Sequence, residues 1–470
     1  MNPLEHQAQV SDLFSTRRQW LNRFGMGFGA LGLAAVMSDD LLLGRAAAAN
    51  DLNPLAPKNP HFPAKAKHVI HIFAQGAPSH LDTWDPKPML TKYDGKSIPG
   101  GNGVAFGSPF KFTKQGRAGI EVSEVFPKLA QHVDEMAVVR SLWTDIPSHE
   151  VATVFMNTGS LRISKPSLGA WTLYGLGTEN QNMPGFIALR PGGGPPGGAN
   201  NYQSAFLPGV FQGSSINTQA ASVQQMIENI QNNYFTQKEQ RRQLDLVHQL
   251  NAIHSQNMQK DAQLEARIEA FEMAYKMQMA ATDAFDVSKE PENIRTMYGS
   301  GPQGKQLLIA RRLVERGVRF VQVWAGGWDH HNDLDDRLKA RATEIDGPAA
   351  ALLTDLKQRG LLDSTLVIWG GEFGRKPTHD KGGTGDPGRD HNNRAFSHWL
   401  AGGGVKGGTV HGATDEFGAR AEVDKVHVHD YHATLLALLG FNHEKLTYRY
   451  NGRDFRLTDN FGQVVKGIIA

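Results

Sequence analysis

Residues 326–334, GGWDHHNDL, place acids and imidazoles on one turn directly after the apolar stretch VRFVQVW. Asp329, His330 and His331 are consecutive, and neutral imidazoles with carboxylates are the ligands that zinc, iron and manganese sites use. A solvated loop or a capping turn has the same composition, so the position after an apolar run carries the argument. We interpret this turn as a metal-binding segment.

Three further groups of histidines and acids follow apolar runs in the same way. In an open sheet of parallel strands, ligands collect beyond the carboxyl ends of the strands. If the apolar runs are parallel strands, all four groups converge on one edge of the sheet. The three further groups are His80, Asp82 and Asp85; Asp145, Ser148, His149 and Glu150; and Glu372, Arg375, His379, Asp390 and His391.

The composition of these groups favours a hydrolytic metal site. A divalent ion held by aspartate and histidine lowers the pKa of bound water, or neutralises charge on a phosphoryl or sulfuryl group. We expect zinc first, with magnesium, calcium or manganese as the other candidates. Nine of the 19 histidines lie between His330 and His432, which argues against a scatter of surface histidines.

Short apolar runs bounded by glycine and proline predict the strands that position these groups. Helical patterns lie between several runs, as at residues 337–362, where apolar residues recur at helical spacing despite Gly347 and Pro348. Alternating strands and helices imply parallel strands with right-handed crossovers, hence an α/β sandwich with helices on both faces. The runs are residues 68–73, 135–142, 185–192, 317–324, 364–371 and 398–404.

Two helical regions stand outside this alternation. Residues 222–284 lack glycine and proline and are rich in Gln, Glu, Lys, Met and Ala. They predict two long helices, which we interpret as a helical insertion over about residues 222–300 that carries no chemistry. Near the C-terminus, HVHDYHATLLALLG predicts a helix with Asp430 as its N-cap and Gly440 as its stop.

The N-terminus is typical of a twin-arginine export signal over residues 1–49. Arg17 and Arg18 precede a glycine-rich apolar run at residues 24–37 and small residues at 46–49. The run is too short to cross a hydrocarbon core of about 30 Å, so we expect no stable transmembrane segment after cleavage. Residues 50–470 then form one domain in the periplasm, at the cell surface or outside the cell.

The composition argues against two kinds of protein, those that bind nucleic acid and those that depend on disulfides. The chain has 470 residues, 20% of them charged, and a net charge of +2, so nothing favours nucleic acid as a partner. It has no cysteine, so an exported form cannot rely on disulfides. Stability must come from the core, from metals, or from both.

In combination, four motifs resemble those of a family of exported sulfatase-like proteins in the alkaline phosphatase superfamily. They are GAPSHLDTWDPKP, GGWDHHNDL, VIWGGEFGRKP and GRDHNNRAFSHWLAGGGVKGG, behind a twin-arginine leader. The resemblance runs from about Ala64 to the C-terminus. It implies an alkaline-phosphatase-like sandwich, with a mostly parallel central sheet and a two-metal site at the carboxyl edge of that sheet.

The resemblance also implies a ligand set. Asp329 with His331, or His330, would hold one metal together with His391, and Glu372 would serve the second. The superfamily usually has an aspartate directly after the first strand, where this chain has Gln75, so Asp82 is the expected replacement. The full set of predicted metal ligands is Asp82, Asp329, His330, His331, Glu372, Asp390 and His391.

The residue at the nucleophile position differs from those of the superfamily, which uses serine, threonine or formylglycine there. Counting back from Thr158 and Gly159, the shared pair, places His149 at that position. Formylglycine is excluded because the chain has no cysteine and no serine in a Ser-x-Pro-x-Arg setting. Three chemistries remain open: Ser148 or Thr153 as nucleophile, His149 as covalent nucleophile or ligand, or attack by metal-activated hydroxide with His149 as acid or base. We favour the last.

Arg375, on a glycine turn after Glu372, has two interpretations. In the first, its guanidinium binds an oxyanion of the substrate with two parallel hydrogen bonds. It is equally well a surface arginine paired with Asp386 or Asp390.

These features predict an exported metal-dependent hydrolase of phosphate or sulfate esters, with small-molecule, polysaccharide or glycoconjugate substrates. The main alternative is a catalytically degenerate metal-binding or scaffold protein of the cell surface, which Gln75 and His149 favour. A mutase or transferase acting on a sugar phosphate is a third possibility, for which no dedicated cap domain is evident.

Overall fold

The computed structural model describes residues 53–101, 103–161, 164–220, 222–226, 234–257, 275, 283–380 and 385–470. The predicted export signal, residues 1–49, lies outside the described residues, and so does part of the predicted helical insertion. Within the described part of the chain, no helix is both long and apolar enough to cross a membrane.

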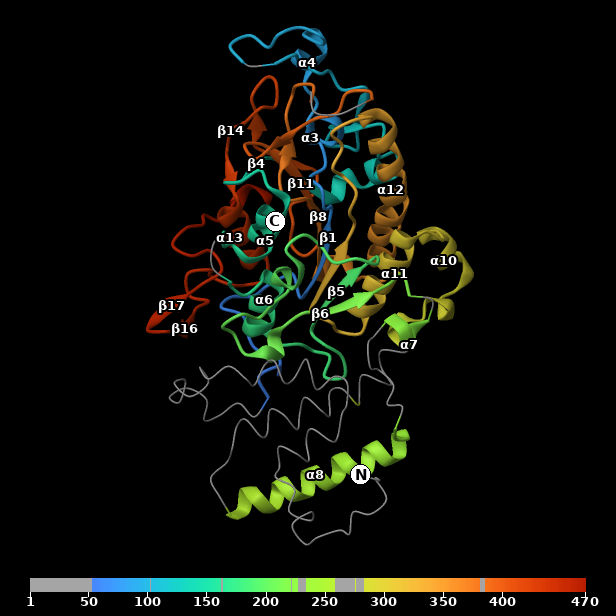
Figure 1. Cartoon of the computed structure of the whole chain (residues 1–470), viewed down its shortest axis with the longest axis vertical. Helices are drawn as coiled ribbons and strands as arrows, with labels where there is room; N and C mark the ends of the chain where they lie inside the picture. The colour runs from blue at the N-terminus through green and yellow to red at the C-terminus, as the bar shows by residue number, and fades with distance from the viewer. Residues whose placement is uncertain are drawn as a thin grey trace, which may run out of the picture.

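A twisted central sheet forms the core of the molecule (Figure 1). Its strand order is β12-β4-β11-β8-β1-β7-β5-β6, with β15 also paired to β4. All six predicted runs occur as strands of this sheet. The strands are β1 (His68–Phe73), β4 (Met136–Trp143), β5 (Phe186–Arg190), β6 (Ser214–Asn217), β7 (Phe320–Trp324), β8 (Thr365–Gly370), β11 (Phe396–Ala401), β12 (Thr409–His411) and β15 (Val426–His427).

The sheet is parallel except at one strand. β1 pairs in parallel with β7 and β8, whereas β11 runs antiparallel to both β8 and β4. Because β4 and β8 are both antiparallel to β11, β4 runs parallel to β8, β1 and β7. The loops after these four strands therefore lie at the same edge of the sheet. Because β11 runs the other way, the residues that precede it lie at that edge too.

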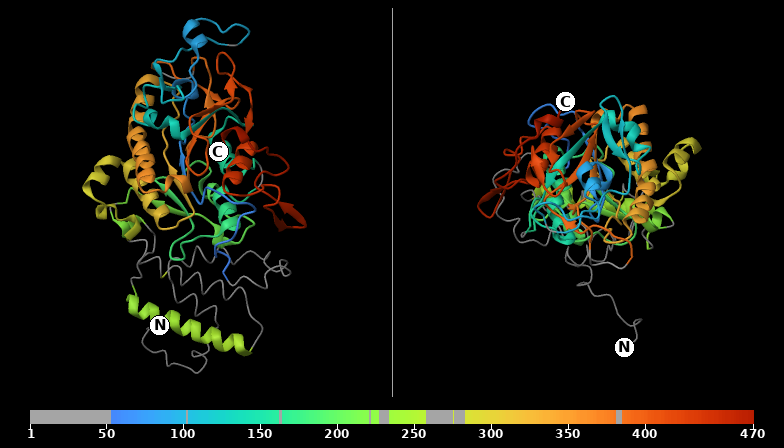
Figure 2. Two further views of the ribbon diagram at one scale, coloured as in Figure 1. Left: turned by 180° about the vertical axis from the view of Figure 1, so that it is seen from behind. Right: turned by 90° about the horizontal axis from the view of Figure 1, so that it is seen from above.

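Helices cover both faces of the sheet, as the views in Figures 1 and 2 show. Along β1, Ile70 and Ile72 pack into one core cluster with α11 and α12, while Val69 and Phe73 pack into the other with α5, α6 and α13. Alternate side chains of a strand point to opposite faces, so a strand buried on both sides is apolar throughout. The predicted α/β sandwich with a mostly parallel sheet is confirmed.

The helices are α3 (His80–Thr83), α4 (Pro88–Lys92), α5 (His149–Thr158), α6 (Leu168–Leu176), α7 (Val223–Met226), α8 (Gln237–Asn257), α10 (Glu292–Tyr298), α11 (Pro302–Glu315), α12 (Leu334–Gln358) and α13 (Val428–Leu438). Short antiparallel pairs lie outside the central sheet. They are β2 (Phe112–Gln115) with β3 (Ile120–Ser123), β9 (Gly374–Arg375) with β10 (His391–Asn392), β13 (Ala413–Thr414) with β14 (Ala421–Val423), and β16 (Tyr448–Tyr450) with β17 (Arg453–Phe455).

The predicted cap of the C-terminal helix α13 is wrong. Its N-cap is His427, whose Nδ1 accepts a hydrogen bond from the backbone N–H of His429 at 3.3 Å. Asp430 stands three residues further on and accepts from the backbone N–H of His427 at 3.0 Å. The two side chains form a reciprocal capping box, in which the acid is the second member rather than the cap.

Candidate metal centre

Four loops bring their side chains together at the carboxyl edge of the sheet. The loop after β7 carries Asp329 and His331, and the loop after β8 carries Glu372. His149 is the first residue of α5, which follows β4. His391 lies on β10, shortly before β11, and reaches the same edge because β11 is antiparallel. Three of the four predicted groups, those after β4, β7 and β8, meet at this edge, whereas the group after β1 contributes no side chain to the cluster.

One oxygen of Asp329 is the centre of this cluster. Its Oδ1 lies 2.9 Å from His331 Nε2, 3.2 Å from His149 Nε2 and 3.3 Å from His391 Nε2. The guanidinium of Arg375 approaches the same oxygen to 2.5 Å. Burial alone would raise the pKa of Asp329, but hydrogen bonds with His149 and His391 and the charge of Arg375 hold it well below its usual range.

Each of the three histidines is fixed through its other ring nitrogen. The pairs are His149 Nδ1 with Glu372, His331 Nδ1 with Asp380 at 2.5 Å, and His391 Nδ1 with the carbonyl of Pro147 at 2.9 Å. A carbonyl or an ionised carboxylate only accepts, so each neutral ring carries its proton on Nδ1. The three Nε2 lone pairs then face Asp329. Histidines that bind metals are held in this way by a carboxylate or carbonyl on the far nitrogen.

The spacing of the donor atoms fits a metal ion. Donors bound at about 2.0–2.1 Å around a tetrahedral ion lie about 3.3 Å from one another. The Nε2 atoms of His331 and His391 are 3.0 Å apart, although neither neutral ring has a proton there to share. Nitrogen lone pairs at this distance need a proton or a cation between them. The donor set of three imidazoles and a carboxylate suits zinc.

The charges around the cluster leave room for a divalent cation. Four carboxylates gather here against two cations, so two negative charges stay uncompensated while the imidazoles are neutral. The carboxylates are Asp329, Glu372, Asp380 and Asp390, and the cations are Arg375 and Lys376. Without a metal, protons take its place: burial lowers the pKa of His149, but hydrogen bonds to Asp329 and Glu372 outweigh it and raise the pKa to about 9.

A second group of possible ligands adjoins the first. His331, Asp380 and Asp390 place one donor atom each within 4.8 Å of one another. Asp390 also accepts from the backbone N–H of His391 at 2.7 Å and pairs with Lys376 at 2.5 Å. Asp380 was missed by the sequence analysis. It lies in the loop between β9 and β10, and only the pairing of those two strands folds it back against His331.

Glu372 stands behind the cluster rather than with the second group. It is fully buried, and its carboxylate accepts from His149 and from the backbone N–H of Gly76 at 3.0 Å. Gly76 has a φ of 104°, and a Cβ there would lie 2.8 Å from the backbone nitrogens of Trp328 and Asp329. The loop after β1, where Gln75 stands, therefore contributes a backbone N–H to the site instead of a carboxylate.

Arg375 occupies neither of the two places considered for it. Its side chain is buried, with a relative exposure of 1%. Nε donates to the carbonyl of Ala77 at 2.9 Å, Nη1 donates to the carbonyl of Arg389 at 3.1 Å, and Nη2 contacts Asp329 and the carbonyl of Gly76. With these N–H groups directed into the protein, Arg375 holds Asp329 in position and does not face the surface.

Besides Glu372, two predicted ligands lie outside both groups. Asp82 is fully buried and binds Arg389 through both oxygens, at 2.6 and 3.0 Å. This pair anchors the residue two positions before His391. His330 is also buried, and burial together with the charge of Arg375 lowers its pKa to about 4. The two predicted hydroxyl nucleophiles differ in exposure. Ser148 is exposed at the N-cap of α5, whereas Thr153 is fully buried in the same helix.

The fold and the convergent histidines define an α/β protein with a candidate divalent-metal centre. Over residues 66–469, the chain matches the family described as "Protein of unknown function (DUF1501)". It belongs to that family. No curated protein matches the chain.

Solved structures similar to this chain include sulfatases and alkaline phosphatases. The PsFucS1 sulfatase from Pseudoalteromonas sp. is 12% identical over 89% of this chain and 72% of its own, with a TM-score of 0.34. The lipoteichoic acid synthase LtaP from Listeria monocytogenes is 10% identical over 89% and 81%, with a TM-score of 0.35. The alkaline phosphatase from the Antarctic bacterium TAB5 is 12% identical over 75% and 94%, with a TM-score of 0.30.

Proposed function

We propose that the protein is a metal-dependent hydrolase of phosphate or sulfate esters. The observation that carries the proposal is the convergence of three histidine Nε2 atoms on one oxygen of Asp329, with every Nδ1 held by an acceptor. Export by the twin-arginine route to the periplasm or cell surface belongs to the same proposal and rests on the sequence of residues 1–49.

Asp329, His149, His331 and His391 would hold the metal. When bound, a divalent ion neutralises charge on a phosphoryl or sulfuryl group and lowers the pKa of water. Assigning His149 as a ligand, rather than as the acid or base, follows from the burial of its Nε2 atom, which faces Asp329 and has no solvent contact. Glu372 keeps the proton of His149 on Nδ1, so Nε2 is available as a donor.

Water is the nucleophile best supported by the side chains near the site. The hydroxyls of Ser148 and Thr153 form no hydrogen bond to a described base, so neither is activated. In hydrolysis, the water oxygen forms a bond to phosphorus or sulfur, the bond to the alcohol oxygen breaks, and that oxygen takes up a proton. The proton of the attacking water is released to solvent.

Lys376 is our candidate donor of the proton to the leaving alcohol. Its side chain is half exposed, lines the cavity beside His391 and pairs with Asp390 at 2.5 Å. A proton donor matters most when the leaving alcohol is a poor leaving group. We expect Lys376→Met to slow hydrolysis of alkyl esters by about 10²–10⁴-fold, while 4-nitrophenyl esters change much less. An equal loss for both classes of ester would remove this assignment.

The test of the proposed function combines metal analysis with assays. Full-length protein purified from its exporting host is expected to hold stoichiometric zinc or another divalent metal by elemental analysis. It is expected to cleave 4-nitrophenyl phosphate, its diester or 4-nitrophenyl sulfate. Activity should disappear with a chelator and return when metal is added back. Protein that carries no metal, or activity that survives complete chelation, would overturn the proposal.

A non-catalytic metal-binding protein is the second candidate, because neither Ser148 nor Thr153 is hydrogen-bonded to a described base and Gln75 stands where a carboxylate was expected. The same experiment separates the two. Stoichiometric metal with no hydrolysis of any of the three esters favours the binding protein, whereas turnover with any of them excludes it.

A further inference from the structure

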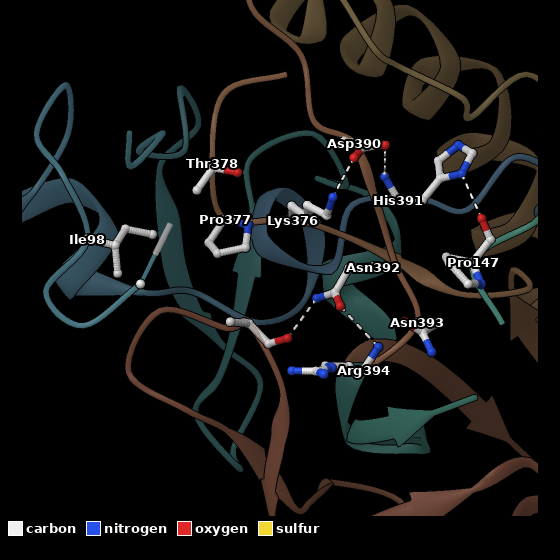
Figure 3. Close-up of a pocket in the computed structure, with 12 residues that line it drawn as sticks. Ile98, Pro147, Lys376, Pro377, Thr378, Asp390, His391, Asn392, Asn393 and Arg394 are labelled. Carbon is white, nitrogen blue, oxygen red and sulfur yellow. Dashed lines mark hydrogen bonds and ion pairs between the residues drawn. The ribbon is translucent and has the colours of Figure 1, made fainter. Parts of the chain in front are cut away.

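A cavity of about 430 Å³ adjoins the metal centre through His391. Figure 3 draws the residues that line it. Ligand sites for small molecules fall in the range of about 300–1,000 Å³. Asp390 and His391, one from each candidate ligand group, both line the cavity. The remaining lining residues are Ile98, Gly101, Pro147, Lys376, Pro377, Thr378, Asn392, Asn393, Arg394 and Ala419.

The polar part of the wall is held in place by the backbone. Asn392 Nδ2 donates to the carbonyl of Ala419 at 3.0 Å, and Asn393 Nδ2 donates to the carbonyl of Thr144 at 2.9 Å. Asn392 Oδ1 accepts from the backbone N–H of Arg394 at 3.0 Å. Fixed amides of this kind can bind hydroxyl groups without losing side-chain freedom on binding.

The two cationic side chains that line the cavity, Lys376 and Arg394, differ in whether a carboxylate pairs with them. Lys376 is paired with Asp390 at 2.5 Å, so its charge is compensated. Arg394 is exposed, and within the described part of the chain its guanidinium forms no ion pair. An uncompensated guanidinium in a cavity is a site for an oxyanion, which it can bind with two parallel hydrogen bonds.

We propose that this cavity binds the alcohol part of the ester, and that this part is a saccharide unit carrying an anionic group of its own that contacts Arg394. The inference rests on the proposed hydrolase function. The amides and the threonine hydroxyl fit a hydroxylated ring, and Ile98 and the two prolines fit its C–H faces. Among the described lining residues there is no Phe, Tyr or Trp on which a nucleobase could stack, so a nucleotide fits less well.

The test measures binding of oligosaccharides of equal length to the metal-loaded full chain by isothermal titration calorimetry. The probes are dextran oligomers, sulfated dextran oligomers and oligogalacturonates. We expect one of the two anionic probes to bind about 10–100-fold more tightly than neutral dextran, as for a charge-assisted hydrogen bond. Which of the two binds more tightly distinguishes a sulfate from a carboxylate on the natural unit.

Arg394→Ala should remove this preference, while Arg394→Lys should keep part of it. The control is Arg449→Ala on the β16–β17 hairpin, an exposed arginine that pairs with Asp454 at 3.2 Å and should keep the full preference. Equal binding of neutral and anionic oligomers, or a preference that survives in Arg394→Ala, overturns the inference. Failure to cleave any ester, with the Arg394-dependent preference intact, instead counts against the hydrolase function alone.

Discussion

Two groups of three histidines, one at the carboxyl edge of the central sheet and one in its core, differ in their surroundings and in their protonation. At the carboxyl edge, the Nε2 atoms of His149, His331 and His391 converge on a carboxylate. Inside the face covered by α5 and α13, three other histidines are buried away from any such partner. They are His71 on β1, His398 on β11 and His432 on α13.

The difference lies in what each ring faces. His398 Nε2 contacts the carbonyl of Gly371 at 2.8 Å, and His432 Nε2 contacts the carbonyl of Met156 at 2.8 Å. Neither nitrogen of His71 has a partner among the described residues. Burial lowers the pKa to about 3 for His71 and His432 and to about 4 for His398. The same residue type is therefore a neutral packing group where burial dominates, and a candidate ligand where carboxylates lie close to it.

The change that breaks the edge group most completely is Asp329→Ala. We expect metal affinity to fall by more than about 100-fold, beyond the ~10–100-fold that loss of a ligand's supporting partner costs, and hydrolysis to be lost. Elemental analysis and ester assays measure both effects. Asp335→Ala, an exposed acid in the first turn of α12, is the matched control and should keep metal and activity. Normal metal content in Asp329→Ala would show that the edge histidines are not a metal site.

Glu372→Gln tests whether the carboxylate at Nδ1 of His149 is what separates the edge histidines from the core histidines. An amide can orient Nδ1 of His149 only in part, so metal affinity should fall by about 10–100-fold while the fold persists. Competition with a chelator of known affinity measures it. Asp145→Asn is the control, because Asp145 pairs with His427 at 2.9 Å outside the cluster and should leave affinity unchanged. Equal effects of the two substitutions would contradict the assignment.

The core histidines predict a dependence of stability on pH. Their folded pKa values lie below the ordinary value of 6.5, so between about pH 4 and 6.5 the unfolded chain binds more protons. The contribution of these three histidines to the free energy of unfolding should fall as pH falls below about 6.5, by up to about 1.4 kcal/mol per pH unit for each histidine, and should be level above it. Urea denaturation in the Asp329→Ala background isolates this contribution. Constant stability between pH 7 and pH 5 would argue against neutral buried imidazoles.

The smallest effect is expected at His71. Both of its ring nitrogens lack partners, and an unsatisfied buried polar group costs about 1–3 kcal/mol, so His71→Leu should stay within about 1 kcal/mol of the parent or stabilise it. His398→Leu is the comparison, since it strands the carbonyl of Gly371 and should destabilise by about 1–3 kcal/mol. Thermal and urea unfolding of the two variants at pH 7.5 measure the difference. A large loss of stability in His71→Leu would indicate that this ring has a polar partner.

Much of this arrangement was predictable from local patterns. The six apolar runs occur as strands, and the polar groups after β4, β7 and β8 do meet at one edge, because parallel strands end together. The group after β1 does not join them, because Asp82 pairs with Arg389. Asp329, His331 and His391 could be singled out as candidate ligands because their types and positions sufficed. The direction of β11 could not be predicted, although it decides that His391 joins the edge, since an apolar run is the same in both directions.

The roles of the supporting residues were not predictable, for the same physical reason. Arg375 looked like a surface or substrate-binding group, yet the carbonyls of Ala77 and Arg389 take up its N–H groups. Asp82 looked like a ligand, yet Arg389, more than 300 positions away, binds both of its oxygens. Partners so distant in sequence leave no local pattern.

The sequence by itself determined which side chains could bind a metal, because donor atoms and their position after buried strands are local properties of the chain. Only the tertiary structure decided which histidines converge on Asp329, because the acceptors that hold each Nδ1 come from other segments of the chain. Protonation and metal binding depend on charges within a few ångströms, and Glu372, the partner of His149, lies 223 positions away in the sequence.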